Sequence, residues 1–204
     1  MTDIYLTRHG ETVWNTKIMM QGRCNSPLTE NGIAGAVRLG GELKDIPFTG
    51  CLVSPLPRAM HTAHLITSQN FSKIPIDIDP LLLEMDLGSW EGMCMKDAKE
   101  KYPEAFDAFR FHPDKFRPVE SGETFFDVRE RALRFLDNIS KRYDGGNGNP
   151  VLVVSHMILV QAMINIAKGE TIETMRDIYP IEQTKIYRIR LSGGPGRSYE
   201  SLDI

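Results

Sequence analysis

The stretch LTRHGETVWN occupies residues 6–15, close to the beginning of the 204-residue chain. The apolar residues around its start predict a short buried strand over residues 3–8. Arg8 and His9 stand at the end of that strand, and Gly10 follows them. Two side chains that can carry positive charge are therefore expected where the chain leaves a sheet. Gly10 has no side chain to obstruct a ligand that approaches this point.

Later parts of the chain repeat this pattern of an apolar run that stops at polar residues, with helical periodicity between the runs. Strands that alternate with helices predict a three-layer α/β/α sandwich with a mostly parallel central sheet. The expected strands are residues 50–54, 74–80, 150–156 and a last one at 185–191; the expected helices are residues 27–45, 58–68, 122–143, 158–167 and the neighbourhood of 96–110.

The helix expected over residues 27–45 contains several glycines, but its start and its apolar pattern are clear. Thr29 is suited to cap the helix, because its hydroxyl can accept a hydrogen bond from a free backbone N–H of the first turn. Ile33, Val37, Gly40 and Leu43 predict the face that packs on the core.

Polar residues at the ends of successive strands are expected to meet, because ligands of such sheets bind beyond the carboxyl ends of the strands. Arg8 and Arg58 present rigid forks of donors, so together they form an anion clamp. Their charge also disfavours a protonated imidazole, which keeps His9 neutral and nucleophilic. Glu84 could supply a proton to a leaving group, and His156 could donate to developing negative charge.

Five motifs occur in order between Tyr5 and His156: LTRHGETVWN, PLTENG, SPLPRAMHTA, EMDLGSWEG and VSHM. They resemble the successive motifs of the histidine phosphatase superfamily, also called the phosphoglycerate mutase-like family. The resemblance implies transient phosphorylation of His9, Glu84 as proton donor and hydrolysis by water, with no metal or other cofactor. It also implies that the phosphoryl group is bound by Arg8, Asn15, Arg58 and His156. Gly22 is a further candidate for phosphate binding, against an ordinary role in a turn.

Other site chemistries fit the residues less well. Asp86 and Glu91 lie close to Glu84, but the spacing of LLLE and GSWEG favours Glu84 as the acid. A zinc site lacks the HExxH spacing, and the two arginines would repel a divalent cation. A serine triad with His156 is excluded because adjacent residues of a strand point to opposite faces.

The expected function is metal-independent hydrolysis of small phosphate monoesters. Two alternatives stay open: phosphoryl transfer of the phosphoglycerate mutase type, and a non-catalytic protein that binds a phospho-ligand. Mutases of the family hold a carboxylate with two adjacent arginines soon after the catalytic glutamate, whereas this sequence has no such pair. A non-catalytic protein would be expected to lack His9 or Glu84.

We expect one domain over residues 1–204, with a cap-like insertion at about residues 90–122. The insertion carries four phenylalanines and three basic residues: Phe106, Phe109, Phe111 and Phe116 alongside Arg110, Lys115 and Arg117. An amphipathic helix that covers the sheet would explain some of these aromatic residues. Met157 follows the second histidine, where the family usually has glycine. A positive φ at Met157 would be strained, and its side chain would narrow the pocket and favour an apolar leaving group.

Composition limits the partners of the protein. A net charge of −3 gives no global basic field for a nucleic acid. The chain begins without a signal peptide, and no apolar run reaches the length of a membrane span. Three widely spaced cysteines favour a reducing compartment, so the cytoplasm is expected. A homodimer is possible, because the strand at 185–191 could be an edge or an interface.

Overall fold

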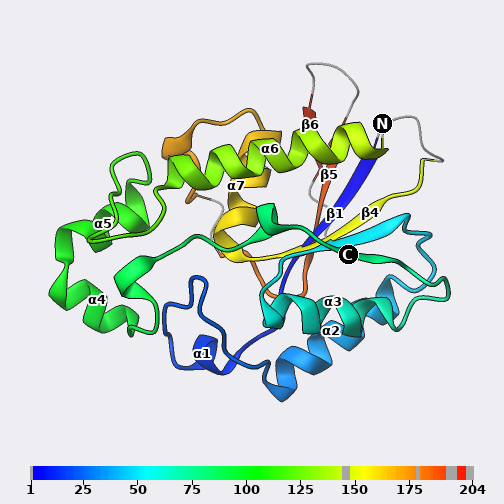
Figure 1. Ribbon diagram of the computed structural model, residues 1–204, viewed down its shortest axis with the longest axis horizontal. Helices are drawn as coiled ribbons and strands as arrows, with labels where there is room; N and C mark the ends of the chain where they lie inside the picture. Colours follow the sequence, from blue (N-terminus) through cyan, green and yellow to red (C-terminus); the bar gives the residue numbers. More distant parts are fainter. Residues whose placement is uncertain (1, 144–147, 178–179, 192–196, 201–204) are drawn as a thin grey trace.

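A computed structural model describes residues 2–143, 148–177, 180–191 and 197–200. It contains a six-stranded sheet in the order β3-β2-β4-β1-β5-β6, with helices on both faces (Figure 1). The predicted α/β/α sandwich is thereby confirmed.

The strands are β1 (Thr2–Arg8), β2 (Gly50–Val53), β3 (Ile76–Ile78), β4 (Val151–Ser155), β5 (Ile186–Leu191) and β6 (Arg197–Glu200). The α-helices are α1 (Val13–Thr16), α2 (Glu30–Glu42), α3 (Pro57–Thr67), α4 (Met95–Lys101), α5 (Pro103–Phe111), α6 (Phe125–Tyr143) and α7 (Met157–Ala167). Short 3₁₀ helices are η1 (Pro80–Leu82), η2 (Gly88–Trp90) and η3 (Ile172–Thr174).

Strand register brings the predicted site residues together. The strands β3, β2, β4 and β1 are parallel, so their carboxyl ends lie at one edge of the sheet. Arg8 of β1 pairs with Ser155 of β4. His9 and His156 therefore leave the sheet side by side.

Strands β2 and β4 are buried on both faces, as expected for parallel strands covered by two helical layers. Alternate residues of β4 point to opposite sides. Val151 and Val153 pack in a core with α6 and α7, whereas Leu152 and Val154 pack in a second core with α2 and α3.

Helix α2 begins at the predicted cap, where the Thr29 side chain accepts from Gly32 N. The predicted apolar face of this helix is only partly correct. Ile33 and Val37 are 37% and 38% exposed, while Leu43 is buried. The buried face consists mainly of small residues: Gly32, Gly35, Ala36, Leu39 and Gly40.

A close crossing of two backbones explains why glycines face inward on α2. A Cβ added to Gly32 would lie 2.1 Å from Glu11 O, and a Cβ added to Gly10 would lie 2.6 Å from Gly32 O. The space beside Gly10 is therefore filled by α2, and the expectation that it admits a ligand is wrong. Small residues let the helix approach the end of β1.

Two other elements differ from the sequence prediction. The helical region near residues 96–110 is divided into α4 and α5, because Pro103 cannot donate a backbone hydrogen bond to continue α4. The strand at 185–191 is not the last one, since β6 follows it. β5 pairs with both β1 and β6, so it is an internal strand and not a free edge. None of the helices in the described ranges has the length and apolar character needed to cross a membrane.

Candidate active site

A cavity of about 320 Å³ opens at the carboxyl ends of the parallel strands. Six of the seven predicted site residues line it: Arg8, His9, Asn15, Gly22, Arg58 and Glu84. His156 is fully buried and lies behind this wall, with its ring centroid 5.2 Å from that of His9. The remaining wall is largely apolar and comes from α4, α5, α7, the loop after α1 and the residue before η2: Ile18, Met19, Met20, Leu87, Met95, Phe109, Met157 and Ile158.

His9 is held in one tautomer by its two ring contacts. Its Nδ1 lies 2.8 Å from Gly10 O, an acceptor, so Nδ1 carries the proton. Arg58 Nε donates to His9 Nε2 over 3.2 Å, which is consistent with a lone pair on Nε2. Burial, assisted by Arg58 and Arg8, holds the pKa of His9 well below 6.5. His9 Nε2 is therefore unprotonated at neutral pH.

Arg58 is held in place beside His9 and is only 2% exposed. Its Nη1 donates to Cys24 O over 2.6 Å, and its Nη2 donates to Gly22 O over 2.7 Å. Burial lowers the pKa of Arg58 to about 10, so it stays cationic at neutral pH. Each terminal nitrogen keeps a second N–H, which leaves donors for an anion in the cavity.

The loop that holds Arg58 is itself held by Glu91. The Glu91 carboxylate accepts from the backbone N–H groups of Arg23, over 2.7 Å, and Cys24, over 3.0 Å. Gly22 has a φ of +49°, and a Cβ at this position would lie 2.2 Å from Glu91 Oε1. Glycine is therefore required here for both its backbone conformation and its size. Glu91 has a structural role in this turn, which removes it as a rival for the proton donor.

Glu84 lies in the cavity wall and is 8% exposed. Its Oε1 accepts from Met85 N over 2.8 Å, and its Oε2 accepts from Ile158 N over 3.3 Å. Asp86, the other sequence rival, forms an ion pair with Arg23 at 3.3 Å. Of the three acids, Glu84 is the one on the cavity wall.

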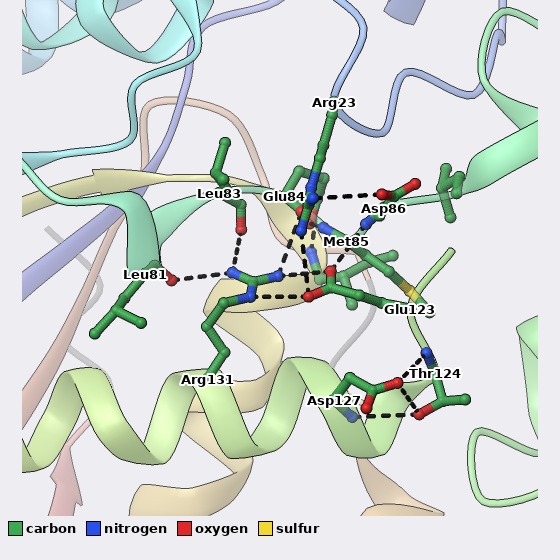
Figure 2. A network of polar contacts seen from close by, with 12 residues as sticks. Arg23, Leu81, Leu83, Glu84, Met85, Asp86, Glu123, Thr124, Asp127 and Arg131 are labelled. Carbon is green, nitrogen blue, oxygen red and sulfur yellow. Dashed lines mark hydrogen bonds and ion pairs between the residues drawn. The ribbon is translucent and has the colours of Figure 1, made fainter. Parts of the chain in front are cut away.

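Figure 2 shows how Arg131 of α6 supports the segment that carries Glu84. Its Nη1 donates to Leu83 O over 2.6 Å and to Leu81 O over 3.0 Å, and its Nη2 lies 3.3 Å from Glu84 O. The same guanidinium binds Glu123 in bidentate fashion, at 3.0 and 2.8 Å. Bidentate pairing fixes the plane of the guanidinium, so the backbone before and at Glu84 is held in place.

His156 keeps one ring nitrogen, and Asn15 keeps its NH₂ group, for contact with a ligand. Ser54 Oγ lies 2.7 Å from His156 Nε2, while His156 Nδ1 has no hydrogen-bond partner among the described residues. Burial lowers the pKa of His156 well below 6.5, with Arg58 as the next cause. Asn15 Oδ1 accepts from both the backbone and the hydroxyl of Thr12, at 3.0 Å each, which leaves its NH₂ group as the donor.

Sequence reasoning missed two features of the site. Arg176, which follows η3, lies in the cavity wall although no motif marks it. Ser54 contacts His156, and its position at the end of β2 was the signal that could have found it.

Met157 begins α7 and lines the cavity, as expected. The non-glycine residues with positive φ in the described ranges are Ile18 and Thr184, so Met157 is not strained.

The site thus places a neutral histidine beside fixed arginines and a carboxylate, an arrangement suited to nucleophilic attack on an anionic substrate. The family model described as the histidine phosphatase superfamily (branch 1) matches residues 4–201. The chain therefore belongs to the histidine phosphatase superfamily.

Particular relatives are phosphatases by name. The chain is 35% identical over 167 residues to a metal-independent phosphoserine phosphatase of Arabidopsis thaliana, which covers 80% of this chain and 67% of that protein. It is 33% identical over 172 residues to an adenosylcobalamin/alpha-ribazole phosphatase of Escherichia coli K12, with coverages of 84% and 82%. The solved structure of Bacillus stearothermophilus YhfR matches with a TM-score of 0.91 and 34% identity, over 98% of this chain and 96% of that one.

Proposed function

We propose that this protein hydrolyses small phosphate monoesters through a phosphohistidine formed at His9. The chain is a phosphatase of the histidine phosphatase type, as its family and its phosphatase-named relatives indicate. The observation that carries the assignment of His9 is its Nε2 lone pair, held unprotonated against Arg58 at the wall of the cavity.

In the first step, His9 Nε2 attacks the phosphorus atom of the bound ester. The P–O bond to the leaving group breaks, and Glu84 protonates the leaving oxygen. Arg58 and Arg8 stabilise the charge on the phosphoryl oxygens as the bond to phosphorus forms.

In the second step, water replaces the leaving group. Glu84, now a carboxylate, accepts a proton from the water as its oxygen attacks phosphorus, and the P–N bond to His9 breaks. Inorganic phosphate leaves and Glu84 is again protonated. Ser54 can donate to His156 Nε2, which places the His156 proton on Nδ1, where it would stabilise the phosphoryl oxygens in both steps. Asn15 would donate from its NH₂ group to the same oxygens.

The nucleophile can be tested with p-nitrophenyl phosphate in the presence of EDTA. We expect His9→Ala to lower kcat by roughly a thousandfold or more, because the covalent route is lost. Replacement of the exposed His61 on α3 by alanine is the matched control and should leave kcat unchanged. Phosphate release that survives His9→Ala would contradict the assignment of the nucleophile.

A second measurement separates hydrolysis from mutase chemistry. Wild-type protein stopped during turnover under alkaline conditions should carry phosphate on the peptide that contains His9. With 3-phosphoglycerate and a bisphosphate primer, release of inorganic phosphate should exceed isomerisation. Isomerisation faster than release would show that the protein is a mutase.

We also propose that the enzyme acts in the cytoplasm. The thiols of Cys24, Cys51 and Cys94 are free, which is the expected state in a reducing compartment.

A further inference from the structure

We propose that Glu123 is a positioning residue for the protonation of the leaving group. It fixes the backbone that carries Glu84 relative to the turn at residues 22–24, which holds Arg58. This inference rests on the proposed function, since it concerns proton transfer by Glu84 in that reaction. Glu123 lies just before α6 and does not line the catalytic cavity, so its effect is exerted through the residues that it contacts.

On one side, Glu123 binds the segment that carries Glu84. Its Oε2 accepts from Asp86 N over 2.9 Å, and its backbone N–H donates to Asp86 O over 2.8 Å. Both backbone polar groups of Asp86, two residues after Glu84, are therefore bound to the same residue. The chain just beyond the proton donor is fixed by these two hydrogen bonds.

Arg131 extends this contact to the backbone at and before Glu84 (Figure 2). Glu123 Oε1 accepts from Arg131 Nε and Glu123 Oε2 accepts from Arg131 Nη2, while Arg131 Nη1 donates to Leu81 O and Leu83 O. The side chains of Glu123 and Arg131 are 17% and 11% exposed, so water and salt screen this pair only weakly. Without the Glu123 charge, a largely buried guanidinium would lack its counter-ion and would shift.

On the other side, Glu123 binds the turn at residues 22–24. Arg23 Nη2 lies 3.3 Å from Glu123 Oε1, and Arg23 Nη1 lies 3.3 Å from Asp86 Oδ2. Figure 2 shows Arg23 extending toward both carboxylates. Arg23 is the middle residue of the turn, and the carbonyl groups on either side of it accept from Arg58. A single carboxylate thus links the backbone of the proton donor to the turn that holds Arg58.

Proton transfer to the leaving group depends on this link. A general acid must lie within about 2.6–3.2 Å of the oxygen that it protonates. A displacement of about 1 Å can lower a rate about a hundredfold. The Glu84 carboxylate accepts from Met85 N, so its position follows that of the local backbone. A shift of this backbone relative to Arg58 would weaken protonation while nucleophilic attack by His9 continued.

A purely structural role for Glu123 makes a different prediction. If Glu123 only stabilises the fold, or only holds the turn beside Arg58, its replacement should impair all phosphate esters equally. If it positions Glu84, its replacement should impair most the esters whose leaving group needs a proton. Phenolate needs a proton more than p-nitrophenolate does, because the nitro group delocalises the negative charge. A general loss of folded enzyme cancels in the ratio of kcat/KM for phenyl phosphate to that for p-nitrophenyl phosphate.

The test measures this ratio in single and double variants. We expect Glu123→Gln to lower it roughly tenfold, which is part of the roughly hundredfold or more that general acid catalysis contributes. Glu84→Gln should lower the ratio further. Addition of Glu123→Gln to Glu84→Gln should then have no further effect on it, because a positioning residue acts only through the residue that it positions. Arg23→Met should lower the ratio by less than Glu123→Gln, since Arg131 still holds Leu83.

Asp127→Ala is the matched control. The Asp127 carboxylate accepts from Thr124 N over 2.7 Å at the beginning of the same helix, four residues after Glu123. Its replacement removes a polar contact of α6 without removing a contact of the Glu84 segment, so the ratio should stay at the wild-type value.

The outcomes distinguish this inference from the proposed function. Equal losses for both esters in Glu123→Gln, or an undiminished effect of Glu123→Gln in the Glu84→Gln background, would overturn the positioning role. If Glu123→Gln does not fold, an unchanged ratio in Arg23→Met would overturn it as well. In each case His9-dependent hydrolysis of p-nitrophenyl phosphate would still support the proposed function.

Discussion

At the scale of single residues, the site depends on the burial of imidazole rings. His9 is 3% exposed and His156 is fully buried, and both lie near Arg58. Burial and positive neighbours act in the same direction on these rings, because both disfavour the protonated form. The folded protein thereby keeps both rings unprotonated under conditions in which an exposed imidazole would begin to bind a proton.

This shift has a consequence for stability. In the unfolded chain the two histidines return to a pKa of about 6.5, whereas in the folded protein the pKa lies well below that value. Below about pH 6.5 the unfolded state therefore binds more protons. As the pH is lowered from about 6.5, we expect the free energy of unfolding to fall by up to about 1.4 kcal/mol per pH unit for each histidine. This fall should continue until the pH reaches the pKa of the folded state.

Urea unfolding of the wild type and of His9→Gln, measured between about pH 6.5 and 5, checks this expectation. The free energy of unfolding should fall less steeply with decreasing pH in the variant than in the wild type. The slopes should differ by up to about 1.4 kcal/mol per pH unit, because the variant lacks one histidine whose pKa is shifted by folding. Contributions from carboxylates cancel in the comparison. Parallel curves for the two proteins would mean that His9 binds protons equally well in both states.

At the scale of elements, α2 shows what sequence reasoning recognised and what it missed. Thr29 marked the start of the helix correctly, because capping depends on a local hydrogen bond. Its buried face was assigned from Ile33 and Val37, which are the larger apolar residues, but they are exposed. The buried face is determined by the close backbone crossing at Gly32. This crossing is a tertiary contact, and the apolar pattern of the sequence does not indicate it.

The same contrast applies to the candidate site. Residues at strand ends, such as His9 and Arg58, were predictable because parallel strands deliver their ends to one edge of the sheet. Arg176 was not, since it lies outside the strand ends and is placed by tertiary contacts with Phe109 and Gln161. Glu91 stood close to Glu84 in sequence, and only its contacts with the loop before α2 distinguish their roles.

Two glycines of α2 allow a matched test of this packing. A Cβ at Gly32 would overlap Glu11 O, whereas a Cβ at Gly41 meets nothing within 4 Å. We expect Gly32→Ala to lower the free energy of unfolding by about 3 kcal/mol, because two backbones must separate. Gly41→Ala should raise it by about 0.5–1 kcal/mol, because alanine favours the helix. Chemical denaturation measures both, and similar effects of the two changes would contradict the packing argument.

At the scale of the whole molecule, the segment at residues 90–122, the predicted cap, places α4 and α5 at one side of the sandwich (Figure 1). Its residues Trp90, Phe109 and Phe116 nevertheless belong to the core that contains α6 and α7. Trp90 is 1% exposed, and its ring lies 5.6 Å from Phe109, which in turn lies 5.7 Å from Phe125 of α6. A continuous chain of buried rings thus joins the cap to the body, while α2 and α3 pack in the other core.

We therefore propose that the cap and the body unfold together. In a Trp14→Phe variant, Trp90 is the remaining tryptophan, so its fluorescence reports on the cap. Its urea transition should coincide with that of far-UV circular dichroism, which reports on all helices. Phe111→Ala is a control within the cap, because this side chain is 66% exposed and should leave both curves coincident. A Trp90 transition at lower urea would show that the cap opens separately, and the cavity wall from Phe109 and Arg110 would then be lost before the sheet unfolds.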